Sequence, residues 1–148
     1  MITRRQFIES SLAASAVFSL TALPFDGYEA RADGHAIRRY ALDAKPSSHQ
    51  FAKDGSPTDL WLYNGECPGP MITAKKGEML EVIFTNHLDQ PTTLHWHGIR
   101  NLNAMDGVPD LTQAAVEPGE SFTYRFPVLD AGTFWYHAHN MAWEQVAR

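Results

Sequence analysis

Apolar and polar residues alternate with a period of two along two stretches of the chain, residues 78–86 (EMLEVIFTN) and 121–127 (SFTYRFP). This is the period of a β-strand, whose successive side chains point to opposite faces of a sheet. The apolar positions that share a face are Leu80, Val82 and Phe84 in the first stretch, and Phe122, Tyr124 and Phe126 in the second. Both stretches are therefore predicted to be strands with one buried face.

A third stretch, TDLWLYN at residues 58–64, is rich in apolar and aromatic residues and is a further predicted strand. Proline and glycine mark turns between such stretches, at 68–70, 76–77, 118–119 and 131–132. No stretch after the first 32 residues shows a sustained helical period. Many short strands separated by turns predict an all-β domain, either an antiparallel sandwich or a Greek-key barrel.

The first residues have a different pattern, with a basic pair, Arg4-Arg5, followed by an apolar run too short for a stable membrane span. The stretch TRRQFI matches a twin-arginine export signal, and Ala30-Arg31-Ala32 fits a cleavage site. We therefore predict a signal peptide at residues 1–32 and one domain at residues 33–148, exported to the periplasm or secreted. An N-terminal amphipathic helix is the alternative interpretation.

Composition narrows the class of protein. The chain has 148 residues, 44% of them hydrophobic, which is enough for one domain with a real core. Its net charge of −5 argues against a nucleic-acid partner, which usually meets a basic patch. The single cysteine, Cys67, excludes an internal disulfide and a CxxC zinc site. Cys67 lies in a Pro/Gly-rich turn and is expected to be a small, partly buried residue.

Four of the seven histidines lie in two stretches with the same spacing, TLHWHGI at residues 93–99 and FWYHAHN at residues 134–140. These four are His95, His97, His137 and His139. If each stretch is a strand, the two imidazoles of a pair share one face and lie about 6.6 Å apart. Both rings can then reach one metal ion, or each can bind a different ion of a close pair.

Four imidazoles converge if the two stretches are neighbouring strands. Such a cluster is unfavourable without a ligand, because each ring nitrogen needs a partner and protonated rings repel one another. A metal ion resolves both problems, and imidazole suits zinc, copper, iron and nickel, so the residues leave the metal open. A single pair could be ordinary surface or core histidine. The isolated His35, His49 and His87 are interpreted in that way.

The stretch LHWHGI together with GTFWYHAH resembles the first cupredoxin domain of the multicopper oxidases, the laccase-like enzymes. Supporting matches are YNGECPGPMI, NAMDGVP, the TQ pair at 112–113 and VEPGESFTYRF. The resemblance runs from about residue 58 to the end. It implies a cupredoxin-like Greek-key β-sandwich or barrel, and it implies copper as the metal.

In that family a trinuclear copper cluster lies between the first and last domains, and the first domain provides half of its histidines. By resemblance His95 matches the type 2 copper ligand, and His97, His137 and His139 match type 3 ligands. Asp106 in MDGVP matches an acidic residue beside the cluster, where it orients bound water and assists proton delivery. A turn-forming aspartate before a glycine is the equally plausible alternative.

The chain also departs from the family pattern. The substrate-oxidising type 1 copper needs a cysteine thiolate with two histidines, and Cys67 has no such neighbours. The isolated histidines do not form the HPxHxH pattern that supplies the other half of the cluster. We therefore expect the N-terminal part of a multicopper oxidase, with the last strand of the domain missing, that is inactive alone and needs a C-terminal cupredoxin domain.

The intact enzyme implied by the resemblance couples one-electron oxidation of a substrate to four-electron reduction of O₂ to water. Its reducing substrate is a phenol, an aromatic amine or a metal ion. Two other classes stay open on the sequence: a non-catalytic cupredoxin-like envelope protein, and a mononuclear site for zinc or another metal. Retention of all four motif histidines argues against the first, and metal analysis separates the second.

Overall fold

The computed structural model of the chain describes residues 36–140. The predicted signal peptide at residues 1–32 lies outside the described residues, as do residues 141–148. Within the described range no helix has the length and apolar character needed to cross a membrane.

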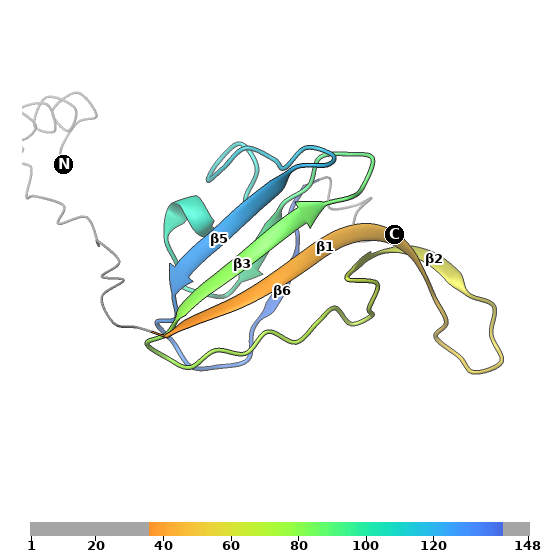
Figure 1. Cartoon of the computed structure of the whole chain (residues 1–148), viewed down its shortest axis with the longest axis horizontal. Helices are drawn as coiled ribbons and strands as arrows, with labels where there is room; N and C mark the ends of the chain where they lie inside the picture. The colour runs from red at the N-terminus through yellow and green to blue at the C-terminus, as the bar shows by residue number, and fades with distance from the viewer. Residues whose placement is uncertain (1–35, 141–148) are drawn as a thin grey trace, which may run out of the picture. The chain divides into compact units, whose positions relative to one another are not determined.

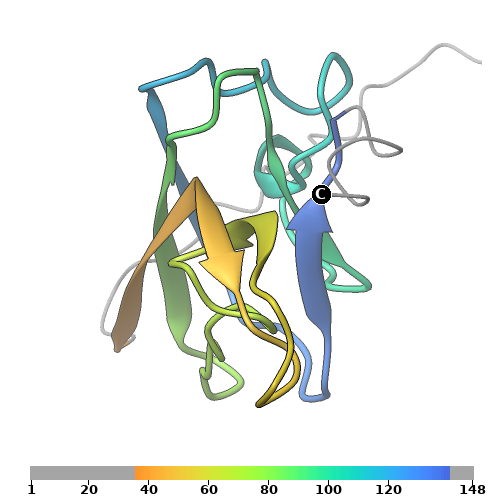
Figure 2. The same cartoon turned by 90° about the vertical axis from the view of Figure 1, so that its right-hand side faces the viewer.

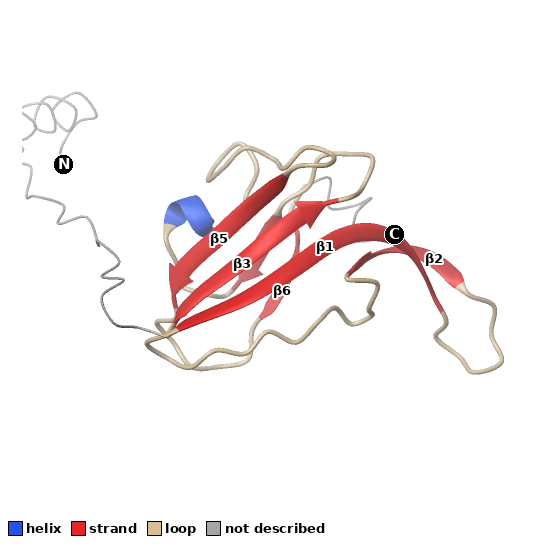
Figure 3. Cartoon of the chain, viewed as in Figure 1, coloured by secondary structure: helices blue, strands red, loops and turns tan. Residues whose placement is uncertain are grey.

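The described residues form strands joined by turns, with a single short helix, which confirms the predicted all-β class (Figures 1 and 3). In chain order the elements are β1 (Ile37–His49), β2 (Thr58–Tyr63), β3 (Met79–Asn86), β4 (Leu94–His97), the 3-10 helix η1 (Asn103–Met105), β5 (Ser121–Pro127) and β6 (Trp135–Ala138). The three strands predicted from sequence patterns are β2, β3 and β5. The two histidine-bearing stretches are β4 and β6, although His139 follows the last residue of β6.

The strands form two sheets, one of four strands in the order β2-β1-β3-β5 and one made by β4 and β6. Figure 2 shows the four-stranded sheet and β6 as separate layers. The long strand β1 pairs with β3 through its first half and with β2 through its second half. The β1–β3 pair is parallel, whereas the sandwich alternative drawn from the sequence was antiparallel. Parallel neighbours need a crossover connection, and here β2 and the residues between β2 and β3 form it.

The core lies between the two sheets and consists of the faces predicted from the period-two pattern. Val82 and Phe84 of β3 are fully buried, and Tyr124 of β5 is also fully buried. From the other sheet, Trp96 of β4 packs its ring 5.6 Å from that of Tyr124 and 5.3 Å from that of Phe126. Burying side chains of this size contributes about 1.5–3 kcal/mol each, so this contact fixes β4 firmly against the large sheet.

One expectation about the surface is wrong. Cys67 is a free, exposed thiol and not a partly buried residue. Cys67 follows the turn after β2, which is closed by the Glu66 amide donating to the Tyr63 carbonyl at 3.1 Å, and its neighbours Glu66 and Pro68 are exposed as well.

Candidate metal centre

The two histidine pairs lie on neighbouring antiparallel strands. In the β4–β6 ladder His95 is opposite His137 and His97 is opposite Trp135. Trp96, between the two histidines of β4, is 2% exposed and points into the core. The alternation predicted for HxH on a strand is therefore confirmed, and it directs the imidazoles to the face away from the core.

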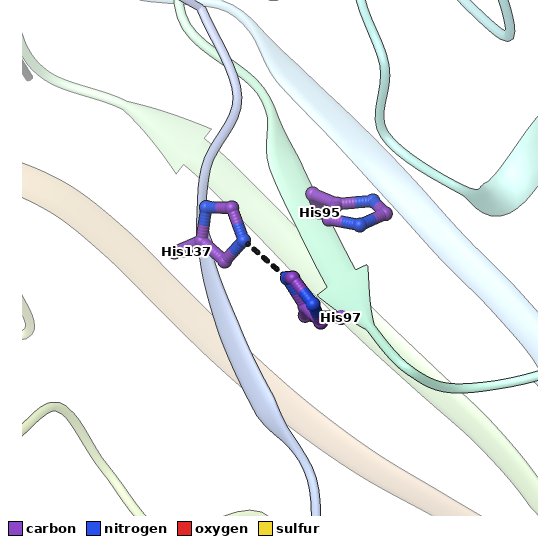
Figure 4. Close-up of side chains that lie close together, drawn as sticks. All are labelled: His95, His97 and His137. Carbon is purple, nitrogen blue, oxygen red and sulfur yellow. Dashed lines mark hydrogen bonds between the residues drawn. The ribbon is translucent and has the colours of Figure 1, made fainter. Parts of the chain in front are cut away.

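The four imidazoles gather in one place. The His95 ring lies 5.6 Å from that of His97, 5.3 Å from that of His137 and 5.0 Å from that of His139, measured between ring centroids. One nitrogen from each of His95, His97 and His137 lies within 4.8 Å of the other two, and Figure 4 shows these three rings facing one another. His139 does not belong to that tighter set, and its ring is 6.0 Å from the His137 ring.

The isolated histidines behave as the sequence indicated where they are described. The ring of His49 makes an edge contact with Phe51 at 4.7 Å. His87 follows the end of β3, and its Nε2 lies 3.7 Å from an Asp43 carboxylate oxygen, with both side chains close to half exposed. His35 lies outside the described residues.

Backbone carbonyl groups fix the proton on two of the rings. His95 Nδ1 lies 2.6 Å from the carbonyl oxygen of Asp106, and His137 Nδ1 lies 2.8 Å from that of Ala138. A carbonyl oxygen only accepts, so in both rings Nδ1 must carry the hydrogen and donate it. The Nε2 lone pair of each neutral ring is then free to bind a metal.

The remaining nitrogen contact joins His97 Nδ1 to His137 Nε2 at 3.1 Å. Without a metal, His97 donates to the free lone pair of His137 in this contact. The same separation suits two ligands of one ion, because two nitrogens each about 2.0–2.1 Å from a tetrahedral metal lie roughly 3.3 Å apart. Replacing the shared hydrogen by a metal therefore requires little movement of either ring.

His137 is also tuned toward its neutral form. Burial lowers its pKa, positive charge on any of the other three imidazoles lowers it further, and the hydrogen bond to the Ala138 carbonyl works in the opposite direction. A lowered pKa keeps the ring unprotonated near neutral pH, which is the state that binds a metal.

Asp106 lies beside this cluster, but its carboxylate does not make the short contact. The nearest carboxylate oxygen is 3.7 Å from His95 Nδ1, whereas the backbone oxygen of the same residue is 2.6 Å away. The carboxylate is partly exposed and can exchange protons with water. Its predicted role in catalysis stays a prediction.

Sequence reasoning missed Trp135. Its indole stacks on the His97 ring at 4.6 Å and on the His137 ring at 4.2 Å, with interplanar angles of 24° and 27°. The residue remains 57% exposed. Its signal was present in the spacing, because Trp135 precedes His137 by two residues and therefore shares its face.

Comparisons with known proteins identify the family. Residues 46–148 match the family described as Multicopper oxidase. The chain is 48% identical to Laccase-1 of Emericella nidulans over 87 residues, which cover 57% of this chain and 14% of that protein. It is 39% identical to Multicopper oxidase MmcO of Mycobacterium tuberculosis over 130 residues, 88% of this chain and 25% of that protein.

A solved structure, the multi-copper oxidase from Pseudomonas thermotolerans, superposes with a TM-score of 0.73 at 44% identity. The superposition covers 77% of this chain and 28% of that one, and it confirms the cupredoxin-like fold. The chain thus spans about a quarter or less of the length of these relatives. With most of its residues matched to the family description, the chain belongs to the multicopper oxidase family.

Proposed function

We propose that this chain supplies half of the ligands of a trinuclear copper cluster in an oxidase that reduces O₂ to water. The ligands are His95, His97, His137 and His139. The observation that carries the proposal is the convergence of nitrogens from three of these rings within 4.8 Å on two paired strands, with the fourth ring 5.0 Å from His95.

Copper fits the donor set. All four donors are imidazoles, which bind copper well, and among divalent first-row ions copper binds most tightly to a given nitrogen site. In two of the rings a backbone carbonyl engages Nδ1, which leaves Nε2 as the nitrogen that can bind copper. Zinc would also accept these donors, so the choice of copper rests on membership of the family.

The contacts also suggest how the ligands divide. His97 and His137 are assigned to the same type 3 ion, because their nitrogens are 3.1 Å apart. His139 is assigned to the other type 3 ion and His95 to the type 2 ion. A further cupredoxin domain is proposed to provide the remaining histidines and the type 1 site.

When bound, copper supplies the one-electron chemistry that joins oxidation of a small reducing substrate to reduction of O₂. The substrate is a phenol, an aromatic amine or a metal ion. The residues of this chain hold the ions in place, and the Asp106 carboxylate delivers protons, since it lies next to His95 and is reached by water. Residues 1–32 are proposed to direct the protein through the twin-arginine route to the periplasm or out of the cell.

The proposal is tested first on the 148-residue chain by titration with Cu(II), followed by electron paramagnetic resonance and metal analysis. We expect nitrogen-coordinated Cu(II), and we expect His97→Ala to weaken binding strongly. His87→Ala is the matched control, because His87 is an exposed histidine outside the cluster, and it should bind like the unchanged chain. Equal binding by the two variants, or uptake of zinc alone from a mixture of both metals, would contradict the proposal.

The second test uses the full-length enzyme, in which a coupled copper pair gives the type 3 absorption band. His97→Ala and His139→Ala should each remove this band, because each deletes a ligand of one ion of the pair. An unchanged band in either variant would overturn the assignment of that residue.

A further inference from the structure

The turn that carries Asp106 lies directly against the backbone of β4. Gly107 in this turn is buried and has a φ angle of +78°. A Cβ atom placed there would overlap the carbonyl group of Leu94 and would lie 3.0 Å from the Cα of His95. Because both obstacles are backbone atoms, no side chain can be fitted at this position without moving the turn away from the strand.

Both sides of this contact are held in place. On the turn, the Met105 amide donates to the Leu102 carbonyl at 2.8 Å, and the Asp106 amide donates to the Asn103 carbonyl at 3.1 Å. On the strand, the Leu94 amide donates to the hydroxyl of the fully buried Tyr124 at 3.0 Å. The close approach therefore joins two fixed segments and does not depend on a flexible side chain.

We propose that the backbone carbonyl of Asp106, brought into position by Gly107, is the group that orients His95 for metal binding. It accepts the Nδ1 hydrogen at 2.6 Å, which holds the ring in one tautomer and directs Nε2 toward the other imidazoles. Asp106 is a positioning residue in this respect, and its carboxylate, at 3.7 Å, is not needed for it.

Only the last step of this inference rests on the proposed function. The tautomer and its cause are properties of the metal-free chain, and they can be measured without copper. The consequence for affinity applies only if His95 is a ligand, so the two parts can fail separately.

The first measurement is long-range ¹H–¹⁵N nuclear magnetic resonance of the metal-free chain, at a pH well above the ordinary histidine pKa of about 6.5. We expect His95 to carry its hydrogen on Nδ1. Asp106→Asn should leave this tautomer unchanged, because the backbone carbonyl is still present. A His95 ring protonated on Nε2, or a change of tautomer in Asp106→Asn, would overturn the proposal even if no glycine variant folded.

The second measurement uses Gly107→Ala with Gly119→Ala as its matched control. Both glycines have positive φ angles, +78° and +82°, but a Cβ at Gly119 would meet nothing within 4 Å. The two substitutions therefore impose similar backbone strain, and only the first displaces a neighbour. Gly107→Ala should convert His95 to a mixture of tautomers, whereas Gly119→Ala should keep the Nδ1 hydrogen. A folded Gly107→Ala chain with an unchanged His95 tautomer would overturn the role given to Gly107.

Copper affinity is then compared among the same variants by titration with Cu(II). Loss of a hydrogen-bond partner behind a ligand typically weakens metal binding about 10- to 100-fold, and we expect a loss of that size for Gly107→Ala. Gly119→Ala should bind as the unchanged chain does. If the unchanged chain shows the Nδ1 tautomer but binds no copper, the positioning by Asp106 stands and the proposed function fails. If all variants bind copper equally, the proposed function stands and the positioning role is wrong.

Discussion

The polar side chains on the outer faces of the two sheets of this domain have opposite kinds of partner. On the outer face of the four-stranded sheet, Glu81 of β3 lies between Arg39 of β1 and Arg125 of β5, its partners in the ladders, with nitrogen–oxygen distances of 2.8 and 3.6 Å. On the outer face of the β4–β6 pair, imidazoles face other imidazoles. One surface pairs opposite charges, whereas the other places like groups together.

This difference separates residues that maintain the fold from residues for which we propose a metal. Exposed ion pairs contribute about 0–1 kcal/mol each, and here each charged side chain of the group has an opposite charge beside it. The imidazole face instead brings the rings of His97, His137 and His139 within 5.6 Å of the His95 ring, and it keeps the large ring of Trp135 exposed. We therefore expect substitutions on the core side of β4 to change stability and substitutions on its outer side to change metal binding.

The largest expected effect comes from Trp96→Ala, which removes the side chain that joins the two sheets. Truncation of a buried aromatic residue costs about 3–5 kcal/mol, and Trp96 is 2% exposed. Denaturant unfolding monitored by circular dichroism measures the free energy of unfolding. The neighbouring His97→Ala, on the outer side of the same strand, should change it by less than about 0.5 kcal/mol without metal. Similar losses in the two variants would remove the distinction between the faces.

A smaller loss is expected for Tyr124→Phe, which keeps the ring and removes only the hydroxyl. The Leu94 amide donates to that hydroxyl at 3.0 Å and would be left buried without its partner, at a cost of about 1–3 kcal/mol. Burial raises the pKa of Tyr124 to about 12, so the hydroxyl is neutral throughout the accessible pH range.

The comparison for this variant is Tyr40→Phe. The hydroxyl of Tyr40 donates to the Thr73 carbonyl at 2.8 Å in an exposed setting. Water can replace that partner, so the loss should be smaller than for Tyr124→Phe. Equal losses of unfolding free energy in the two variants would show that leaving the Leu94 amide buried without a partner adds nothing to the cost.

The strands that were predictable are those with one buried face. In β3 the alternation of Leu80, Val82 and Phe84 matches the observed burial, because a single sheet face packs on a single core. Strand β1 shows only a short alternation, with Leu42 and Ala44 set against Asp43 and Lys45. Its buried residues Leu42 and Ala44 lie where it passes from pairing with β3 to pairing with β2, and that change of partner is a property of the tertiary structure.

The site likewise has a part that could be predicted from the sequence and a part that could not. The convergence of the four histidines was predictable because the spacing of each pair on a strand places both rings on one face. That these rings bind a metal stays a prediction. The contact from Asp106 to His95 was not, because it uses a backbone carbonyl, which every residue has and no sequence pattern reveals. The sequence singled out Asp106 for its carboxylate, whose role stays a prediction, and gave no sign of this backbone contact.

On the outer face, Trp135→Leu should lower copper affinity about tenfold, because the indole stacks on the rings of both His97 and His137 and restricts their orientation. Titration with Cu(II) measures the affinity, and Phe134→Leu is the control. Phe134 is also exposed, at 40%, but it lies one residue before β6, and its ring lies beside Gly98 and Gly132. A loss of affinity in Phe134→Leu equal to that in Trp135→Leu would assign the effect to general disturbance of β6.

The smallest expected effect is the dependence of the metal-free chain on pH. Because the pKa of His137 is lowered in the folded state, the unfolded chain binds the proton more readily, and stability must fall as the pH drops below the unfolded value of about 6.5. Above that value the ring is neutral in both states and contributes no slope. Urea unfolding at a series of pH values should therefore show a small acid-side loss, which His137→Gln reduces. Saturating Cu(II) should steepen the dependence, because acid then also displaces the metal from its imidazole ligands. An acid-side loss that is the same with and without His137→Gln would contradict the lowered pKa of His137.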